Sequence, residues 1–256
     1  MKMVVKGFFE EASTWKTIIE ALSALVKEIY FSADESGLHA RAIDEAHIAM
    51  VDLQVPSSVF QDYKCTGETK FGISLTEMMQ IMRRAGGSDS LELTVDETKN
   101  KLKLKLKSDK VTRNFSLSLL GDTSGEEIPI PKIEFNTIIN IVAGVFKDAI
   151  KDAEVVGDYI LLETTADMLK VAAEGDTGEV EVIIDKETDT LYKYEVREES
   201  KAIYALKYLS DMTKAVSAAE NLEIEYSSDM PLKIGFETIG GGKLEYFLAP
   251  RIEGSE

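Results

Sequence analysis

The sequence contains little cysteine, histidine or proline. A single cysteine, Cys65, among 256 residues permits no disulfide within the chain and no cysteine-based metal site. We interpret Cys65 as a small, partly buried apolar side chain in a protein of a reducing compartment. The only histidines are His39 and His47, which excludes a metal site made of several histidines. With 5 prolines and 17 glycines, the composition excludes collagen-like and low-complexity classes.

Long apolar runs are also missing. A membrane-spanning helix needs about 18 or more consecutive apolar residues, and the sequence has no such run. Residues Met1–Lys6 alternate charged and apolar side chains and lack the apolar stretch and cleavage site of a secretory signal. We therefore expect a cytoplasmic protein. Its hydrophobic fraction of 44% is enough to build the core of one large domain or two small ones.

Catalytic motifs are absent or incomplete. Asp44–His47 reads Asp-Glu-Ala-His, a signature of helicase-type ATPases, but that chemistry also requires a phosphate-binding loop. The glycine-containing candidates, Gly67–Lys70 and Gly240–Leu244, lack its spacing and the hydroxyl after the lysine. No nucleophile elbow, dinucleotide fingerprint or calcium loop occurs. We expect a protein that is not an enzyme, with no catalytic residue, cofactor or metal.

Acidic residues outnumber basic ones. The chain has 46 Asp and Glu against 29 Lys and Arg, a formal net charge of -17. This balance opposes binding of nucleic acid to the surface as a whole. A net charge can conceal a local basic patch, so the positions of the basic residues matter more than their sum.

The sequence contains an internal repeat. Leu38 and Leu169 occupy matching positions, and 169 − 38 = 131 is the offset between them. The same offset aligns Trp15 with Phe146 in predicted helices. Because this offset holds through helices, strands and turns, it indicates two homologous halves of about 120 residues.

Each half is predicted to contain two helices and several strands. Apolar residues at helical spacing predict helices over residues 13–26, 74–85, 140–154 and 206–219. Short β-branched or alternating runs predict strands over residues 48–53, 102–106 and 179–184. We interpret the alternating lysines near residues 102–106 as a solvated strand face rather than a phosphate site. The pattern predicts the α+β class with two βαβ-type domains.

A glycine-rich, acidic segment with two prolines, residues 121–132, separates the halves and is typical of a linker. It contains two isoleucines, Ile128 and Ile130, in a segment that otherwise favours water. These side chains either pack onto the protein beneath them or line a docking site. The domains that we expect are an N-terminal domain (1–119), a connector (120–133) and a C-terminal domain (134–256).

Basic residues recur on the polar faces of the four predicted helices. Lys16 matches Lys147 at the repeat offset, and Arg83 matches Lys214. Any one of them is an ordinary surface residue, but the repeated placement indicates a basic strip on an otherwise acidic protein. Nucleic acid is attracted to such a strip and repelled by the rest of the surface. We name this set the basic strip; its members are Lys16, Arg83, Arg84, Lys147, Lys151, Lys207 and Lys214.

Several short motifs follow one another in order along nearly the whole chain. They are Asp34–Leu38, Ala42–Ile48, Ile130-Pro131, Tyr204–Leu209, Thr213–Ala215, Pro231-Leu232 and Tyr246–Glu253. In this order they resemble the proliferating cell nuclear antigen family of DNA sliding clamps, and especially its archaeal members. The resemblance implies a DNA clamp fold with antiparallel outer sheets and four inner helices. It also implies a trimeric ring that encircles duplex DNA as a polymerase processivity factor, nucleoid-associated in an archaeal cell or nuclear in a eukaryotic one.

The resemblance assigns the basic strip to the channel of the ring. Its cations would contact phosphates rather than bases, so the attraction is independent of sequence and exchanges easily as the ring slides. Thr17 and Ser23 stand where some members carry lysine, which predicts a less basic channel.

The resemblance also implies that subunits join through edge strands. The corresponding segments are about Lys110–Leu119 and Gly178–Ile184. Pairing two different edges head to tail closes a ring when the rotation suits. The residues expected to face each other across this joint are Lys110, Arg113, Glu179 and Glu181.

Partners of the family insert a short peptide with an aromatic plug into an apolar pocket under the connector. The expected partners are DNA polymerase, the clamp loader, flap endonuclease and DNA ligase. His47 is expected to meet the polar residue of the peptide. The resemblance implies a pocket lined by Ile43, His47, Ile48, Met50, Ile128, Ile130, Pro131, Pro231, Phe247, Ala249, Pro250 and Ile252.

Three other hypotheses are compatible with the sequence. The chain could be a specialised subunit that closes a ring only with different sister chains, rather than a homotrimer. It could be an acidic enzyme with an unrecognised carboxylate site, which predicts activity from a monomer and no basic strip. It could be a scaffold that binds peptides without DNA.

Overall fold

The computed structural model describes residues 5–121, 128–215, 219–238 and 241–252. The chain divides into two compact units. Unit 1 consists of Met1–Ile43, Val51–Pro129 and Glu237–Leu244. Unit 2 consists of Asp44–Met50, Ile130–Phe236 and Glu245–Glu256. No helix in the described ranges combines the length and the apolar character needed to cross a membrane.

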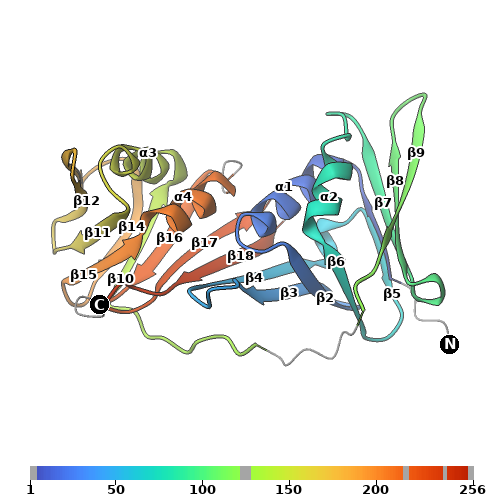
Figure 1. Cartoon of the computed structure of the whole chain (residues 1–256), viewed down its shortest axis with the longest axis horizontal. Helices are drawn as coiled ribbons and strands as arrows, with labels where there is room; N and C mark the ends of the chain where they lie inside the picture. The colour runs from blue at the N-terminus through green and yellow to red at the C-terminus, as the bar shows by residue number, and fades with distance from the viewer. Residues whose placement is uncertain (1–4, 122–127, 216–218, 239–240, 253–256) are drawn as a thin grey trace. The chain divides into compact units, whose positions relative to one another are not determined.

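The first half of the chain supplies most of unit 1, apart from Glu237–Leu244 (Figure 1). Its helices are α1 (Ala12–Ser23) and α2 (Leu75–Met82), with short 3₁₀ helices at Ser57–Val59 and Glu97–Lys99. Its strands are β1 (Val5–Phe9), β2 (Glu28–Asp34), β3 (Gly37–Ile43), β4 (Ala49–Pro56), β5 (Asp62–Cys65), β6 (Thr69–Ser74), β7 (Ser90–Asp96), β8 (Lys101–Lys107) and β9 (Thr112–Ser118). The strands lie in the orders β5-β1-β7-β8-β9 and β4-β3-β2-β6.

The second half repeats this series and supplies most of unit 2, although residues 237–244 belong to unit 1 (Figure 1). Its helices are α3 (Ala143–Glu154) and α4 (Leu206–Ala215). Its strands are β10 (Thr137–Val142), β11 (Tyr159–Thr164), β12 (Met168–Gly175), β13 (Gly178–Asp185), β14 (Leu191–Val196), β15 (Ser200–Ala205), β16 (Asn221–Tyr226), β17 (Leu232–Thr238) and β18 (Gly242–Leu248). They lie in the orders β14-β10-β16-β17-β18 and β13-β12-β11-β15.

The predicted repeat is confirmed by corresponding hydrogen bonds in the two halves. The Ala12 amide, at the start of α1, donates to the Asp89 carbonyl at 2.7 Å. The Ala143 amide, at the start of α3, donates to the Glu220 carbonyl at 2.9 Å. Since 143 − 12 = 131, these helices begin one repeat offset apart. Both halves therefore fix the start of their first helix in the same way.

Helix α1 shows how the core of unit 1 is assembled. Its buried residues are Ala12, Trp15, Ile18, Ile19, Ala21 and Leu22. They recur at the three- and four-residue spacing that brings side chains to one face of a helix. The Trp15 ring centroid lies 5.7 Å from that of Phe9 on β1 and 5.7 Å from that of Phe31 on β2. One side chain of the helix thus contacts both sheets of this unit.

The predicted ends of the helices are wrong by a few residues. Helix α1 ends at Ser23 rather than residue 26, and the Ser23 hydroxyl donates to the Ile19 carbonyl at 2.6 Å. Helix α3 begins at Ala143 rather than residue 140, because β10 extends to Val142 and pairs there with Asn221. An apolar run shared by a strand and a helix does not mark the boundary between them.

Helix α2 is also shorter than predicted. Helix α2 begins at Leu75 and ends at Met82, and the Ser74 hydroxyl caps it by accepting from the Glu77 amide at 3.3 Å. Helix α4 begins at Leu206, as predicted, and its described part ends at Ala215. Residues 216–218 of the predicted helix and 122–127 of the connector lie outside the described residues.

The strand with alternating lysines has the structure that the pattern predicts. On β8, Leu102, Leu104 and Leu106 are buried. Lys103 and Lys105 lie on the opposite, exposed face. The strand pairs antiparallel with β7 and β9, as do all the strand pairs whose register is described. β9 and β13 each end the order of their own sheet.

Candidate functional site

Three residues of the basic strip lie on or directly after the helices of unit 1. Lys16 is half-buried on α1, with its Nζ 3.9 Å from the Glu20 carboxylate one turn away. Arg83 and Arg84 directly follow α2 and are exposed. Helix α1 packs against α2. The helix pair of unit 1 therefore presents two exposed arginines and a lysine whose ion pair with Glu20 is long.

The helix pair of unit 2 carries the other members of the basic strip. Lys147 is half-buried on α3, and Lys151 is exposed with its Nζ 2.8 Å from Asp148. The hydrogen bond and charge of Lys151 hold the pKa of the Asp148 carboxyl below its usual value. Lys207 is exposed on α4, which packs against α3. Exposed ion pairs of this kind are weak, so these cations can exchange a carboxylate for another anion.

Lys214 lies in α4, but its side chain is outside the described residues.

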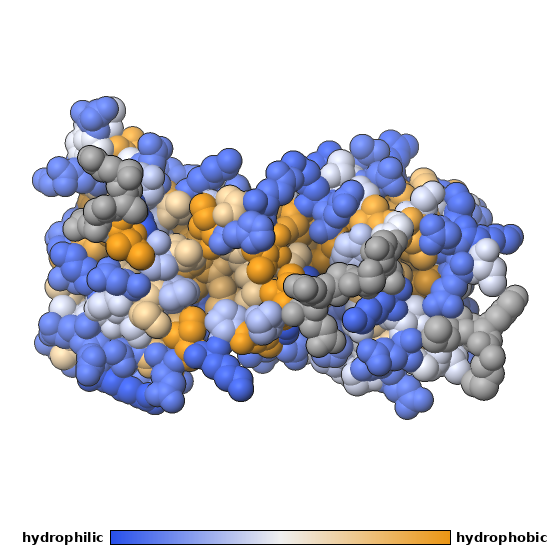
Figure 2. All heavy atoms as spheres, turned by 60° about the horizontal axis from the view of Figure 1, so that its bottom comes forward, coloured by the Kyte–Doolittle hydropathy of each residue, from blue (hydrophilic) through white to orange (hydrophobic). Residues whose placement is uncertain are grey.

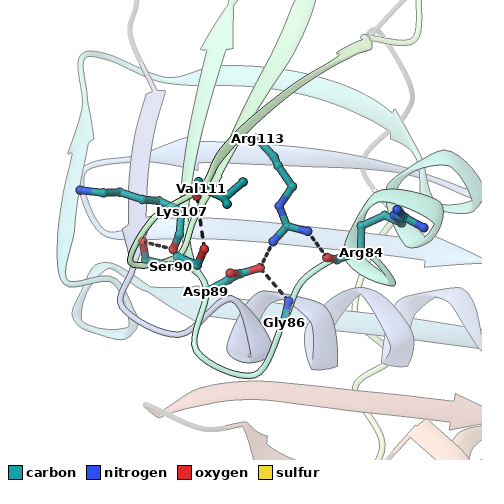
Figure 3. A network of polar contacts seen from close by, with 8 residues as sticks. Arg84, Gly86, Asp89, Ser90, Lys107, Val111 and Arg113 are labelled. Carbon is teal, nitrogen blue, oxygen red and sulfur yellow. Dashed lines mark hydrogen bonds and ion pairs between the residues drawn. The ribbon is translucent and has the colours of Figure 1, made fainter.

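The predicted joint residue Arg113 is held inside unit 1 (Figure 3). From β9, its guanidinium donates to the Asp89 carboxylate and to the Arg84 carbonyl. Asp89 is only 3% exposed and also accepts from the Gly86 amide at 2.7 Å. The network thereby ties the edge strand β9 to the turn that follows α2.

The other predicted joint residues are exposed. Lys110 lies in the bend that precedes β9. Glu179 and Glu181 lie on β13, and the Glu181 carboxylate is 3.0 Å from Lys170 Nζ. Two apolar side chains beside them are also exposed, Val111 at 53% and Ile183 at 56%. Such side chains on an unpaired edge favour the addition of another strand.

The residues 44–48 form a turn organised by one carboxylate. Asp44 accepts hydrogen bonds from the amides of Ala46 at 3.1 Å, Ile48 at 2.8 Å and Ala49 at 2.7 Å. His47 has a φ of 57°, a left-handed conformation that costs a residue other than glycine about 1 kcal/mol or more. We name residues 44–48 the Asp44 loop. The Asp-Glu-Ala-His sequence, which does not indicate an ATPase without a phosphate-binding loop, is thus a turn motif with a structural role.

A helix contributes a fourth hydrogen bond to the Asp44 loop. The Tyr208 hydroxyl, on α4, donates to the Asp44 carboxylate at 2.7 Å. Burial alone would raise the pKa of Asp44, but the hydrogen bonds from Ala49, Tyr208, Ile48 and Ala46 outweigh it and hold the pKa below its usual value. Burial and the bond to Asp44 raise the pKa of Tyr208 to about 12. Asp44 therefore remains an anion and Tyr208 a donor near neutral pH.

Exposed apolar side chains accompany the Asp44 loop in unit 2. Ile48 is 40% exposed, Ile130 42% and Ile252 64%. The Ala249 amide donates to the Ile48 carbonyl at 2.9 Å, which joins the C-terminal segment to the loop. Figure 2 shows hydrophobic areas on an otherwise largely hydrophilic face of the molecule.

The remaining predicted pocket residues of unit 2 differ in exposure. Met50 and Phe247 are buried, and Pro131 and His47 are exposed. Pro231, Ala249 and Pro250 are half-buried. Buried members of this set can support a binding surface, while the exposed and half-buried members can contact a ligand directly.

The two predicted pocket residues of unit 1 are Ile43 and Ile128. Ile43 is 36% exposed at the end of β3, and Ile128 is half-buried. The Ile128 carbonyl accepts from the Arg41 guanidinium, whose Nε donates to Asp52 at 2.6 Å. One side chain of β3 thereby holds the connector at Ile128.

Sequence reasoning missed three residues that organise these surfaces. Arg41 and Asp52 hold the connector, and Tyr208 holds the Asp44 loop. An aspartate that opens a turn is a recognisable signal, because its carboxylate often accepts from nearby backbone amides. No comparable local signal exists for Arg41 or Tyr208. Among the described residues, no group of three or more His, Cys, Asp and Glu is placed to hold a metal ion.

Both halves of the chain match known family descriptions. Residues 4–121 match the family described as "Proliferating cell nuclear antigen, N-terminal domain". Residues 129–251 match "Proliferating cell nuclear antigen, C-terminal domain".

Similar proteins cover nearly the whole chain. A DNA polymerase sliding clamp of Methanococcus maripaludis strain C5 is 40% identical over 244 residues, which is 93% of this chain and 96% of that protein. One from Thermofilum pendens is 35% identical over 251 residues, 98% of this chain and 100% of that protein. The crystal structure of PCNA from Thermococcus kodakaraensis superposes with a TM-score of 0.91 at 27% identity, covering 96% of this chain and 100% of that one.

Proposed function

The chain belongs to the proliferating cell nuclear antigen family, and from this premise we propose that three copies close into a ring around duplex DNA and tether enzymes to it. The protein is an archaeal-type DNA polymerase sliding clamp, a processivity factor and not an enzyme. Residues 1–119 and 134–256 are its two clamp domains, and residues 120–133 are the connector. DNA polymerase, the clamp loader, flap endonuclease and DNA ligase are its clients.

Ring closure is supported by the two edge strands β9 and β13. They have seven and eight residues and end the orders of two different sheets. Ile183 on β13 and Val111 beside β9 expose apolar surface that a monomer would normally protect. Head-to-tail pairing of β9 with β13 of the next subunit covers both edges. The exposed edges are the observation that carries the ring proposal.

The charges near these edges support their pairing. Lys110 is an exposed cation beside β9, and Glu179 is an exposed anion on β13. Arg113 contributes differently from the sequence prediction, because it positions β9 through Asp89. Glu181 forms an ion pair with Lys170 of its own unit. The pair Lys110 and Glu179 is therefore the best placed to attract across the joint.

DNA contact is supported by the basic strip. Its exposed members lie on or next to helices in both units, and they interact with at most exposed carboxylates. Cations that give up such weak pairs can contact phosphates in turn along a duplex without reading its sequence. Encirclement, and not the strength of these contacts, retains the ring on DNA.

Client binding is supported by three exposed isoleucines of unit 2, one of which lies in the Asp44 loop. Ile48, Ile130 and Ile252 offer apolar surface, and His47 next to Ile48 offers a polar group. A short peptide with an aromatic plug buries such apolar surface, and its polar residue meets His47. A scaffold that binds peptides without DNA would need the same surface but no basic strip.

Two measurements test the ring. Light scattering of the purified chain should give a mass of about three times 28.3 kDa. Rings loaded onto a closed circular duplex should be retained and should be released when the circle is linearised. A monomeric mass would contradict the homotrimer and support a subunit that needs sister chains. Equal retention on circular and linear DNA would contradict encirclement.

A further inference from the structure

The Asp44 loop presents two residues of the proposed client surface through a single anionic anchor. The amides of Ala46 and Ile48 in the loop, and of Ala49 directly after it, donate to the Asp44 carboxylate at distances from 2.7 to 3.1 Å. The Asp44 carbonyl also accepts from the His47 amide at 3.0 Å. These bonds hold His47 in its left-handed conformation, and the bond from the Ile48 amide fixes the backbone of the next residue. The presentation of His47 and Ile48 therefore depends on the position of the Asp44 carboxylate.

The only side-chain donor to this carboxylate in the described part of the chain is Tyr208. Its hydroxyl lies 2.7 Å from Asp44 Oδ2, and it comes from a residue 164 positions away. Tyr208 lies in the first turn of α4, next to Lys207 of the basic strip. The backbone amides fix the conformation of the loop, whereas the Tyr208 hydroxyl joins the loop to helix α4.

We propose that Tyr208 is a positioning residue for client binding, which holds the Asp44 loop on α4 so that His47 and Ile48 meet the client peptide. The proposal rests on the proposed client surface. It adds Tyr208 to the residues that client binding needs, although Tyr208 itself does not contact the client. Without the hydroxyl, the loop keeps its internal bonds but samples positions in which His47 does not face the peptide. The apparent affinity then falls with the fraction of rings in the competent arrangement.

The proposal predicts a specific loss of affinity. A hydrogen bond to a charged group stabilises its arrangement enough that Tyr208→Phe should weaken binding of a client peptide by about fivefold to tenfold. The loss should concern the polar residue of the peptide more than its aromatic plug, because His47 belongs to the Asp44 loop. A general destabilisation of unit 2 would weaken both parts alike.

Calorimetry with two synthetic peptides separates these cases. The first peptide carries one glutamine and an aromatic plug, and in the second the glutamine is alanine. Wild type should prefer the first peptide, and Tyr208→Phe should lose most of that preference while still binding the second. This double-mutant cycle isolates the coupling between the hydroxyl and the polar residue.

Tyr194→Phe is the matched control. Its hydroxyl also lies in unit 2 and donates at 2.8 Å, but to the Thr165 carbonyl. The control should keep the wild-type preference between the two peptides. If Tyr208→Phe keeps it as well, or weakens both peptides equally, the positioning role of Tyr208 is wrong. If wild type binds neither peptide, the proposed client surface itself is wrong, which is a different result.

Discussion

The Arg41 guanidinium joins Asp52 of β4 to the backbone of Ile128 in the connector. Its Nε donates to the Asp52 carboxylate at 2.6 Å, and its Nη1 donates to the Ile128 carbonyl. Asp52 is buried, so its carboxylate fixes the position of the guanidinium that bonds the connector. Two donors in fixed geometry on one side chain are a property of arginine that lysine lacks.

The first prediction concerns this pair of bonds. Arg41→Lys keeps the charge but cannot make both bonds, so the connector loses its attachment at Ile128. We expect about a tenfold weaker affinity for the client peptide, measured by calorimetry, with an unchanged ring mass. Lys103→Ala is the control, because it removes another ion pair of unit 1, to Asp96 at 2.6 Å. Unchanged peptide affinity in Arg41→Lys would show that the connector needs no anchor.

The second prediction concerns the basic strip. Because Lys207 is expected to neutralise one phosphate, Lys207→Gln should reduce the slope of log affinity for duplex DNA against log salt by about one. Lys105→Gln makes the same charge change on the exposed face of β8, outside the basic strip. Its slope should equal that of wild type. Equal slopes for all three proteins would contradict a role of Lys207 in DNA binding.

The third prediction concerns the joint between subunits. In the proposed ring, Lys110→Glu places an anion opposite Glu179 of the next subunit and should weaken each joint by about 1 kcal/mol, the scale of an exposed charge pair. Sedimentation at falling protein concentration should show earlier dissociation of the ring. Lys110→Glu combined with Glu179→Lys should restore the assembly. If the double variant dissociates as readily as the single one, these residues do not face each other.

The fourth prediction concerns the network around Arg113. Arg113→Ala leaves Asp89, only 3% exposed, without its cation. Because Arg113 itself is 32% exposed, we expect a loss of about 2–3 kcal/mol in the free energy of unfolding, less than for a fully buried pair. Lys103→Ala, whose ion pair is more exposed, should lose less than about 1 kcal/mol in the same denaturant titration. Equal losses would mean that the buried network contributes no more than a surface pair.

The fifth prediction concerns acid. The pKa of Asp44 is lower in the native protein than its ordinary value of 3.8, so its ionised form stabilises the fold. This contribution is complete above pH about 4 and is lost as the pH falls through the native pKa. The stability difference between wild type and Asp44→Asn should therefore be constant from neutral pH to about 5 and shrink only below about 4. A difference that already shrinks near neutral pH would indicate that another group is responsible.

Much of the fold could be predicted because burial on one face imposes a period on the sequence. The buried residues of α1 and the leucines of β8 follow that rule, and so does the match between the halves. The ends of helices and strands depend on pairing with distant residues rather than on this period. Val142 belongs to β10 because Asn221 pairs with it, and that partner lies far away in the sequence.

The candidate site divides in the same way. The placement of the basic strip on or next to helices could be predicted because its residues share helical spacing, whereas its contact with DNA stays a prediction. The pocket residues came from a family resemblance, and their role in client binding stays a prediction. Arg41 and Tyr208 could not, because their partners lie 87 and 164 residues away and no local pattern marks them. Arg113 was expected to face acidic residues across the joint, and in the structure its guanidinium forms an ion pair with Asp89 inside unit 1.

The edge strands β9 and β13 come from opposite halves of the repeat. A ring that pairs β9 of one subunit with β13 of the next has all its subunits oriented alike. Its two faces therefore differ, and an enzyme can distinguish one face from the other. Every client would therefore bind in the same orientation along the duplex. The direction in which a bound enzyme moves would be set by which face of the ring pointed forward when the ring was loaded onto DNA.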